Sequence, residues 1–203
     1  MSKVVLATGN PGKVEEMQRE LQAFGLTVLP QSDFEIPEAI EDGLSFVENA
    51  IKKARHACLH TGLPSIADDS GLEVDALGGA PGIYSARYAD GLGDIANNVK
   101  LLAALDGQQN RSARYQCVIA YMRHAKDPTP ILCHGCWEGE IALISAGTNG
   151  FGYDPIFYVA KHHCNAAELN AEQKKHLSHR AKALAILKQA MDPLLHNKPL
   201  ASN

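Results

Sequence analysis

The chain has 203 residues, of which 45% are hydrophobic and 21% are charged, and its formal net charge is -4. This length and composition suit one medium-sized α/β domain, or two small lobes around one cleft. No apolar run reaches the roughly 20 residues that cross a membrane, and the slightly acidic balance gives no broad basic face for nucleic acid.

The N-terminal segment predicts a strand, a turn and a helix. Residues 3–8 are strand-like, residues 9–12 form a Gly-Asn-Pro-Gly turn, and a second short strand is expected at residues 26–29. Because the first strand begins without the apolar stretch and small-residue cleavage site of a signal peptide, we expect a cytoplasmic protein. The apolar stripe of the intervening helix consists of Val14, Met17, Leu21 and Phe24.

An acidic loop at residues 38–43 precedes a second predicted helix. Ser45 and Glu48 form a capping box that opens this helix, and the helix ends near Gly62. Asn49 and Lys53 lie four residues apart and off the apolar stripe, on a face that turns either to a cleft or to solvent. The expected apolar face consists of Phe46, Val47, Ala50, Ile51, Ala54 and Cys58.

The middle of the chain predicts short strands, loops and one helix. A short strand at residues 65–67 is expected to end in the turn-like segment Asp68-Asp69-Ser70-Gly71. Residues 78–82 contain three glycines and a proline, which predicts a loop. A helix is expected at residues 94–105.

Two long strands are predicted at residues 113–123 and 130–144, and we expect them to pair antiparallel. A second glycine-rich loop at residues 147–152 leads into a strand at residues 156–159. The last helix is expected to begin at Ser178. Its inward residues are predicted to be Ala181, Leu184, Leu187 and Met191.

This order of elements predicts a mixed α/β fold rather than the regular alternation of a doubly wound sheet. No internal repeat or low-complexity linker divides the chain. Residues 1–203 are therefore expected to form one unit, with a tail that frays from about residue 197.

The five cysteines are an odd number and are spread along the chain, which argues against a disulfide framework and for a reducing compartment. Cys133 and Cys136 have CxxC spacing. Because there is no second pair and the segment is strand-like, we favour ordinary packing over a metal or redox role.

The turn between the first strand and the first helix is a candidate phosphate site. Free amides at a helix N-terminus and the positive end of the helix dipole attract anions. Lys13 adds a positive charge there, and Thr8 and Asn10 can donate hydrogen bonds. The spacing is not that of a P-loop, so an ordinary strand-to-helix turn is an equally open interpretation.

The adjacent carboxylates Asp68 and Asp69 are a candidate metal site. Like charges this close repel each other unless a cation or hydrogen bonds offset the repulsion, and oxygen ligands suit Mg²⁺. The acidic loop, with Glu38, Glu41 and Asp42, can supply a third carboxylate. A solvated acidic turn is the alternative.

Two C-terminal segments complete the candidate residues. Residues 150–155 combine glycines with two aromatic side chains, which can stack on a base or simply pack in the core. Lys174, His179 and Arg180 form a basic cluster that, from the residues alone, we interpret as a surface charge run. A phosphate turn, paired carboxylates, lysines and an aromatic loop together favour hydrolysis of a nucleoside polyphosphate.

Six ordered segments, spread over nearly the whole chain, carry a resemblance to a known family. They are Thr8-Gly-Asn-Pro-Gly-Lys13, Ser45-Phe-Val-Glu-Asn-Ala-Ile-Lys-Lys-Ala54, Ala67-Asp-Asp-Ser-Gly-Leu72, Gly78-Gly-Ala-Pro-Gly-Ile-Tyr-Ser-Ala-Arg87, Gly150-Phe-Gly-Tyr-Asp-Pro155 and Ser178-His-Arg180. The sequence resembles the purine nucleoside triphosphate pyrophosphatases that act on non-standard purines, also called inosine/xanthosine triphosphate pyrophosphatases or dITP/XTP diphosphatases.

The resemblance implies an elongated, two-lobed α/β fold with a long central mixed sheet and the active site in the cleft between the lobes. It implies a homodimer that requires Mg²⁺ and binds a small nucleotide rather than nucleic acid or membrane. It also implies cleavage of ITP, dITP and XTP to the monophosphate and pyrophosphate, which cleanses the nucleotide pool of deaminated purines.

The resemblance also implies roles for individual residues. Asp69, Lys13 and Lys53 are the expected catalytic residues, and Glu41, Asp69 and Asp68 the expected metal ligands. The expected substrate contacts are Thr8, Gly9, Asn10, Pro11, Gly12, Lys13, Lys53, Ser70, Phe151, Gly152, Tyr153, Asp154, Lys174, His179 and Arg180. The basic cluster is thereby reassigned from a surface charge run to the base site.

The expected mechanism is in-line attack of water on the α-phosphorus, with Asp69 taking the proton and the two lysines stabilising charge. Mg²⁺ neutralises the leaving pyrophosphate. Hypoxanthine and xanthine carry a keto oxygen where adenine carries an amino group, and Arg180 with nearby backbone amides are the candidate donors to it. The sequence does not show how guanine, which shares the keto group, is excluded.

Three alternatives remain open from the sequence. A triphosphate pyrophosphatase of the septum-inhibitor-like type would act on modified pyrimidines. A binding module without turnover would not need Asp68, Asp69, Glu41 and both lysines. A metal-dependent phosphomonoesterase would release orthophosphate.

Overall fold

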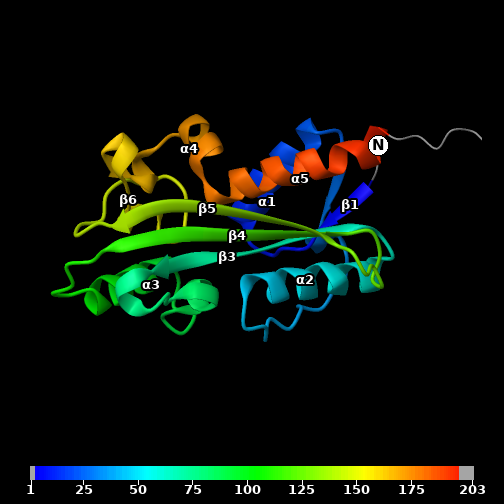
Figure 1. The fold of residues 1–203 in the computed structure, drawn as a ribbon. Coiled ribbons are helices and arrows are strands. Elements are labelled where there is room, and N and C mark those ends of the chain that lie inside the picture. The colour runs from blue at the N-terminus through cyan, green and yellow to red at the C-terminus, as the bar shows by residue number, and fades with distance from the viewer. Residues whose placement is uncertain (1–2, 197–203) are drawn as a thin grey trace, which may run out of the picture.

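The computed structural model describes residues 3–196, with side chains as far as Asp192. A mixed seven-stranded sheet in the order β2-β1-β3-β4-β5-β6-β7 runs through this region (Figure 1). The first strand is parallel to both of its neighbours, and all other neighbouring strands are antiparallel. The predicted mixed α/β class is confirmed, while the predicted fraying from residue 197 lies outside the described residues.

The helices and strands follow each other along the chain in the order now given. They are β1 (Lys3–Leu6), α1 (Pro11–Ala23), β2 (Thr27–Pro30), α2 (Phe46–Thr61), β3 (Ser65–Val74), α3 (Asp94–Ala104), β4 (Ser112–Met122), β5 (Ile131–Ile141), β6 (Phe157–Val159), β7 (Cys164–Asn165), α4 (Ala171–Leu177) and α5 (His179–His196). None of the described helices is long and apolar enough to cross a membrane.

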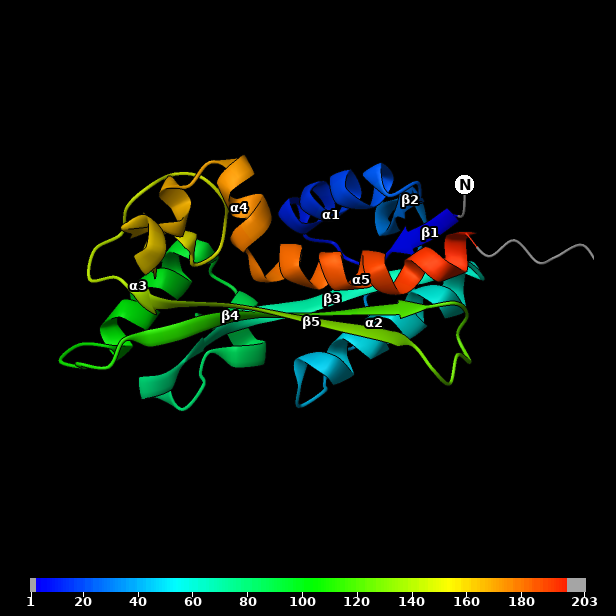
Figure 2. The ribbon, with the colours of Figure 1, turned by 45° about the horizontal axis from the view of Figure 1, so that its top comes forward.

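Three long strands, β3, β4 and β5, extend through both lobes of the elongated molecule (Figures 1 and 2). At one end, α1 and α5 cover one face of the sheet and α2 covers the other. At the other end, α3 and the segments after β5 enclose a separate core around Leu101, Tyr115 and Phe157. Each lobe therefore has its own core, and the long strands join the two.

The second helix begins and ends where its capping residues predict. The Ser45 hydroxyl accepts a hydrogen bond from the Glu48 amide at 3.3 Å, and Gly62 ends the helix in the left-handed conformation. The predicted apolar stripe is only partly right, because Val47 is 40% exposed whereas Asn49 is 1% exposed. The buried stripe is lined by small residues, Ala50, Ala54 and Ala57, which let α2 lie close to the sheet.

The segment containing the two aspartates is not a turn after a short strand, as the sequence predicted. It lies in the middle of β3, which continues to Val74 and pairs antiparallel with β4 over its whole length. Aspartate and glycine have low strand propensity, so the pattern at residues 68–71 signals a turn. The pairing with β4 and the cations that surround the carboxylates outweigh that local preference.

Several boundaries differ from prediction elsewhere. The fifth strand ends at Ile141 rather than at residue 144, and α4 and β7 were not predicted because both are too short to show a period. In α5, Ala183 is fully buried whereas Ala181 is only half-buried. The other predicted inward residues, Leu184, Leu187 and Met191, are buried.

The two cysteines of the CxxC segment cannot act together, because they lie three residues apart on one strand. Successive strand residues face opposite sides of a sheet. Cys133 is buried in the core beneath α1 and α5, and Cys136 is on the other face, where its thiol lies 3.3 Å from a Glu138 oxygen. The preferred interpretation, ordinary strand packing, is confirmed.

Gly135 allows α5 to lie directly on the sheet. A Cβ atom at this position would overlap the carbonyl oxygen of His179 and would lie 2.7 Å from the amide nitrogen of Ala183. These are backbone atoms of α5, so the clash cannot be relieved by rotating a side chain. Only glycine keeps the first turn of α5 at this height above β5.

We expect Gly135→Ala to lower the free energy of unfolding by about 3 kcal/mol or more, because the added methyl group must push the helix from the sheet. His134→Ala is the matched control: its side chain is exposed on the opposite face, so its loss should be about 0.5 kcal/mol. Urea denaturation of the two variants measures the difference. Equal stabilities would contradict the close approach.

Candidate active site

The candidate site lies at an edge of β3 that no strand covers. The Ala7 amide donates to the Ile66 carbonyl at 2.8 Å, after which the chain leaves the sheet through the turn at residues 8–13. Farther along the same edge, the Leu72 amide donates to the Ser85 hydroxyl at 2.8 Å. Between these two points, no strand of the described part of the chain pairs with this edge.

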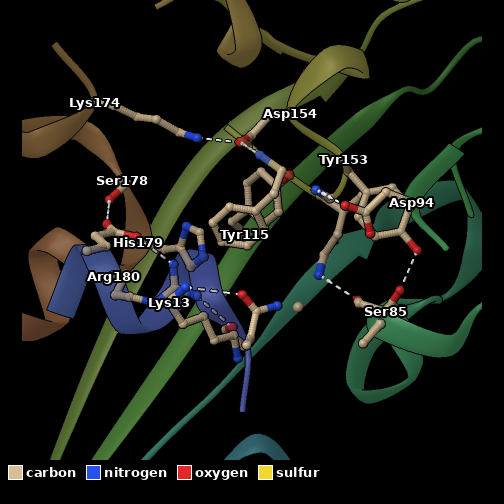
Figure 3. A pocket seen from close by; sticks show the side chains of 18 residues that line it. Lys13, Ser85, Asp94, Tyr115, Tyr153, Asp154, Lys174, Ser178, His179 and Arg180 are labelled. Atoms are coloured by element: carbon tan, nitrogen blue, oxygen red, sulfur yellow. Dashed lines mark hydrogen bonds and ion pairs between the residues drawn. The ribbon is translucent and has the colours of Figure 1, made fainter. Parts of the chain in front are cut away.

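A cavity opens at this edge between the two lobes (Figure 3). Its wall contains most of the residues that were predicted to bind substrate, from four separate parts of the chain. These residues are Asn10, Lys13, Ser70, Phe151, Gly152, Tyr153, Asp154, Lys174, His179 and Arg180. Thr8, Gly9, Pro11 and Gly12 form the turn beside it.

The turn at residues 8–13 is organised by its own side chains. The Asn10 carboxamide oxygen accepts from the Lys13 amide at 3.1 Å and caps α1, and the Thr8 hydroxyl oxygen accepts from the Asn10 amide at 3.3 Å. A Cβ atom at Gly12 would lie 2.8 Å from the Phe151 ring. The missing side chain therefore lets the aromatic loop rest against the turn.

On the α1 and α5 face of the sheet, Asp68 binds two cations. Its Oδ2 atom lies 3.0 Å from Lys13 Nζ and accepts from Arg180 Nε and Nη2 at 3.3 Å. The Arg180 guanidinium also donates to Glu16 at 2.8 Å and to Ser70 at 3.0 Å. Two acidic and two basic side chains, together with Ser70, thus form one network of hydrogen bonds and ion pairs.

The charges of this network are fixed. Burial alone would raise the pKa of Asp68, but the positive charges of Lys13 and Arg180 outweigh burial and hold that pKa well below its usual range. The carboxylate of Asp68 in turn offsets burial at Arg180 and raises the pKa of the guanidinium. Asp68 is therefore a permanent anion and is a poor base.

On the α2 face, Asp69 has different partners. Its Oδ1 atom accepts from Lys53 at 2.9 Å, and its Oδ2 atom accepts from the Asn49 carboxamide at 3.2 Å. Lys53 also donates to Glu41 at 3.1 Å, so one ammonium group joins the two carboxylates. The side chains of Asn49 and Lys53 thus face Asp69 and Glu41 rather than solvent, so the interpretation as a solvated helix surface is wrong, although neither residue lines the cavity between the lobes.

The pKa of Asp69 is raised, unlike that of Asp68. Burial is the largest cause, and the positive charge of Lys53 opposes it only in part. At Lys53 itself, burial would lower the pKa, but Asp69, Asp68 and Glu41 together raise it, so the lysine stays positive. A carboxylate with a raised pKa beside a permanent cation has the properties of a general base.

Asp68 and Asp69 are adjacent in the sequence of one strand, and their side chains therefore lie on opposite faces of the sheet. Because strand residues alternate between faces, Asp68 points toward α1 and α5, as Ile66 does, and Asp69 points toward α2, as Ala67 does. The described residues contain no group of three or more histidine, cysteine or acidic side chains placed to hold a metal. The structure thus brings Glu41 and Asp69 together, and Asp68 stands apart from them.

At the other end of the cavity, the aromatic loop and the basic cluster meet. The Asp154 carboxylate forms an ion pair with Lys174 and accepts from the Phe151 amide at 3.0 Å. Lys174 and Arg180 lie 5.9 and 5.8 Å from the centre of the Phe151 ring. The interpretation of the basic cluster as a surface charge run is wrong, since His179 and Arg180 are 8% and 2% exposed.

His179 is neutral in this environment. Burial, followed by the nearby positive charge of Arg180, lowers its pKa well below the usual value. Its Nδ1 atom is buried and has no hydrogen-bond partner among residues 3–192. A buried, neutral ring nitrogen without a partner at a cavity wall is suited to bind a polar group of a ligand.

The sequence did not single out several residues of the cavity wall. Glu16, Ser85, Asp94, Tyr115 and Ser178 line it. Glu16 lies three residues after Lys13 on α1, so helical periodicity could have placed it beside the turn. Ser85 and Ser178 lie inside two of the motifs that carry the family resemblance, whereas Asp94 and Tyr115 reach the cavity through tertiary packing, which leaves no local pattern.

The fold and these charges define an α/β protein that has a capped, lysine-bearing helix start and a carboxylate–lysine cluster on either side of one strand. Residues 4–190 match the model of the Ham1 family, and the chain therefore belongs to that family. The family resemblance inferred from the sequence is confirmed.

The relatives that the chain matches cover nearly its whole length. The dITP/XTP pyrophosphatase of Vibrio cholerae serotype O1 is 58% identical over 195 residues, which are 95% of this chain and 98% of that protein. The dITP/XTP pyrophosphatase of Thioalkalivibrio sulfidiphilus is 58% identical over 188 residues, 91% of this chain and 96% of that protein. The solved HAM1 protein of Coxiella burnetii has a TM-score of 0.89 at 49% identity, covering 95% of this chain and 99% of that one.

We expect Asp68→Asn to lower the free energy of unfolding by about 3 kcal/mol at pH 7, because Lys13 and Arg180 lose their buried counter-ion. Asp75→Asn, which breaks an exposed pair with Arg114, should cost much less. The folded-state pKa of Asp68 is depressed, so its stabilisation is complete above about pH 4 and is lost as the pH falls through that folded-state pKa. Urea denaturation at pH 7 should therefore separate the variants. A difference between wild type and Asp68→Asn that grows below pH 4 would contradict the assignment.

Proposed function

We propose that this protein hydrolyses inosine and xanthosine triphosphates, including dITP, to the monophosphate and pyrophosphate. The observation that carries the proposal is the Asp69–Lys53–Glu41 cluster, in which a carboxylate with a raised pKa contacts a cation within electrostatic range of Lys13 from the turn at residues 8–13. The names of the relatives, dITP/XTP pyrophosphatases, support the choice of substrate.

In the proposed reaction, water attacks the α-phosphorus in line with the leaving pyrophosphate. Asp69 takes the proton from that water, which its raised pKa favours. Lys53 and Lys13 stabilise the charge that develops on the phosphate oxygens, and Ser70 with the turn at residues 8–13 orients the chain of phosphates. Asp68, held by Lys13 and Arg180, fixes the position of Lys13 in this arrangement.

We propose Mg²⁺ as the cofactor, held by Glu41 and Asp69. These two carboxylates already converge on one positive group, Lys53, and Mg²⁺ needs only one or two carboxylates besides substrate phosphates and waters. The cation would neutralise charge on the phosphates. Asp68, the third predicted ligand, would act on the metal through its charge from the opposite face.

For base recognition, we propose Lys174 as a donor to the keto oxygen in addition to Arg180. Of the five N–H groups of a guanidinium, four of Arg180 already bind Asp68, Glu16 and Ser70, which leaves one on Nη1. Lys174 binds only Asp154 among the described residues, so its ammonium retains two donors. Phe151 would stack on the purine.

Product analysis tests the function directly. Incubation of ITP, XTP, ATP and GTP with protein and Mg²⁺, followed by ion-exchange chromatography, should give IMP and pyrophosphate from ITP and little product from ATP or GTP. A chelator should stop the reaction, and added Mg²⁺ should restore it. IDP with orthophosphate would mean attack at the γ-phosphorus and would overturn the mechanism. Cleavage of modified pyrimidine triphosphates alone would overturn the substrate assignment.

We expect Asp69→Asn to reduce the turnover of ITP by at least ~10²-fold, because the base and one unit of negative charge are lost. The matched control is Glu73→Gln on the same strand, whose carboxylate binds Gln116 at 2.8 Å away from the cavity. Steady-state kinetics of both variants with ITP test whether Asp69 is the base. Near-normal turnover in Asp69→Asn would remove Asp69 from the mechanism.

We also propose that the chain acts as one unit, that it forms a homodimer and that it resides in the cytoplasm. The three strands shared by both lobes support the first of these. All five cysteines are free, which suits a reducing compartment.

Val47 and Leu132, 40% and 44% exposed, line one groove on the α2 face, and such apolar surface suits an interface. Light scattering should give twice the mass of the chain, and the mass of a single chain would contradict the dimer.

A further inference from the structure

Tyr115 lies on β4 in the wall of the cavity and contacts both sides of the proposed base site. Its ring stacks on the His179 ring, with centroids 4.6 Å apart and an interplanar angle of 8°. Its hydroxyl donates to Asp154 Oδ1 at 3.3 Å. Figure 3 shows Tyr115 between the aromatic loop and the start of α5.

Through these two contacts Tyr115 reaches the groups that would hold the base. The Oδ2 atom of Asp154 binds the Phe151 amide and Lys174, so the orientation of this carboxylate sets the position of both. His179 has no other ring contact among the described residues, and its Nδ1 atom makes no hydrogen bond.

The hydroxyl of Tyr115 is not explained by core packing. The ring lies in the apolar core of the second lobe, against Phe157, with centroids 4.6 Å apart, and a phenylalanine would fill that space. A buried hydroxyl costs free energy unless it is hydrogen-bonded. Here its partner is the carboxylate that orders the aromatic loop.

We propose that Tyr115 is a positioning residue for base recognition, which holds Asp154 with Phe151 and Lys174 on one side and His179 on the other. This inference rests on the proposed function. In the described part of the chain, the hydroxyl of Tyr115 bonds to Asp154 and its ring contacts Trp137, Phe157 and His179, none of which belongs to the turn at residues 8–13 or is Asp69. Removal of the Tyr115 hydroxyl should therefore weaken binding of the nucleotide and leave the chemical step unchanged.

The test compares Tyr115→Phe with Tyr121→Phe. Tyr121 lies six residues farther along the same strand, on the same face and packed against the other core, so its substitution is the same chemical change away from the site. For Tyr115→Phe we expect the KM for ITP to rise about 5-fold with kcat within 2-fold of wild type, the scale of one lost hydrogen bond. Both constants should stay within 2-fold in Tyr121→Phe. An unchanged KM, or a fall in kcat at unchanged KM, would overturn the proposal.

A second readout does not depend on turnover. Trp137 is the one tryptophan of the chain and stacks near Tyr115, with ring centroids 6.2 Å apart, so its fluorescence reports on this wall. In an Asp69→Asn background, ITP should change the Trp137 emission, and adding Tyr115→Phe should raise the dissociation constant about 5-fold. An equal dissociation constant in the two backgrounds would overturn the proposal.

The same measurements separate this inference from the proposed function. If wild type fails to cleave ITP, the proposed function fails, and the fluorescence titration still decides whether Tyr115 orders a nucleotide site. If wild type cleaves ITP and Tyr115→Phe binds it normally, only the role of Tyr115 is lost. Because Tyr115→Phe removes a single oxygen atom and keeps the ring, the core should tolerate it, and urea denaturation checks that the variant is folded before its KM and dissociation constant are compared with those of wild type.

Discussion

The ion pairs of Asp68 are the interaction on which the site depends. A fully buried carboxylate would be costly alone, and here Lys13 from α1 and Arg180 from α5 lie 3.0 and 3.3 Å from the same oxygen. These contacts fix the start of α1, the start of α5 and the middle of β3 relative to one another. These ion pairs hold together the elements that carry the turn at residues 8–13, the basic cluster and Ser70.

Because successive side chains of a strand point to opposite faces, the neighbouring aspartate, Asp69, lies in a different environment. Asp69 faces α2, where Asn49 and Lys53 reach it and where burial raises its pKa. One strand thus presents a carboxylate fixed by cations on one face and a carboxylate with a raised pKa on the other. Both groups lie beyond the point where β1, which ends at Leu6, pairs with β3.

Much of this could be predicted from sequence, and the omissions have physical causes. Caps and apolar periods located α1, α2, α3, β4 and β5, because those signals are local. The length of β3 was missed, because its strand character comes from the pairing with β4 and not from its residues. The partners of Asp68 were missed because Arg180 is 112 positions away, and Tyr115 was missed because one tyrosine on an apolar strand looks like core. The family motifs supplied the site residues, but only the structure separates the surroundings of Asp68 from those of Asp69.

The lobes share β3, β4 and β5, and this limits how the molecule can deform. Two lobes on a flexible linker would swing apart as rigid bodies, whereas continuous strands permit only bending and twisting of the sheet itself. The parts of the cavity wall that come from the two lobes are therefore joined by continuous strands. A ligand that drew the two lobes together would have to bend or twist these three paired strands.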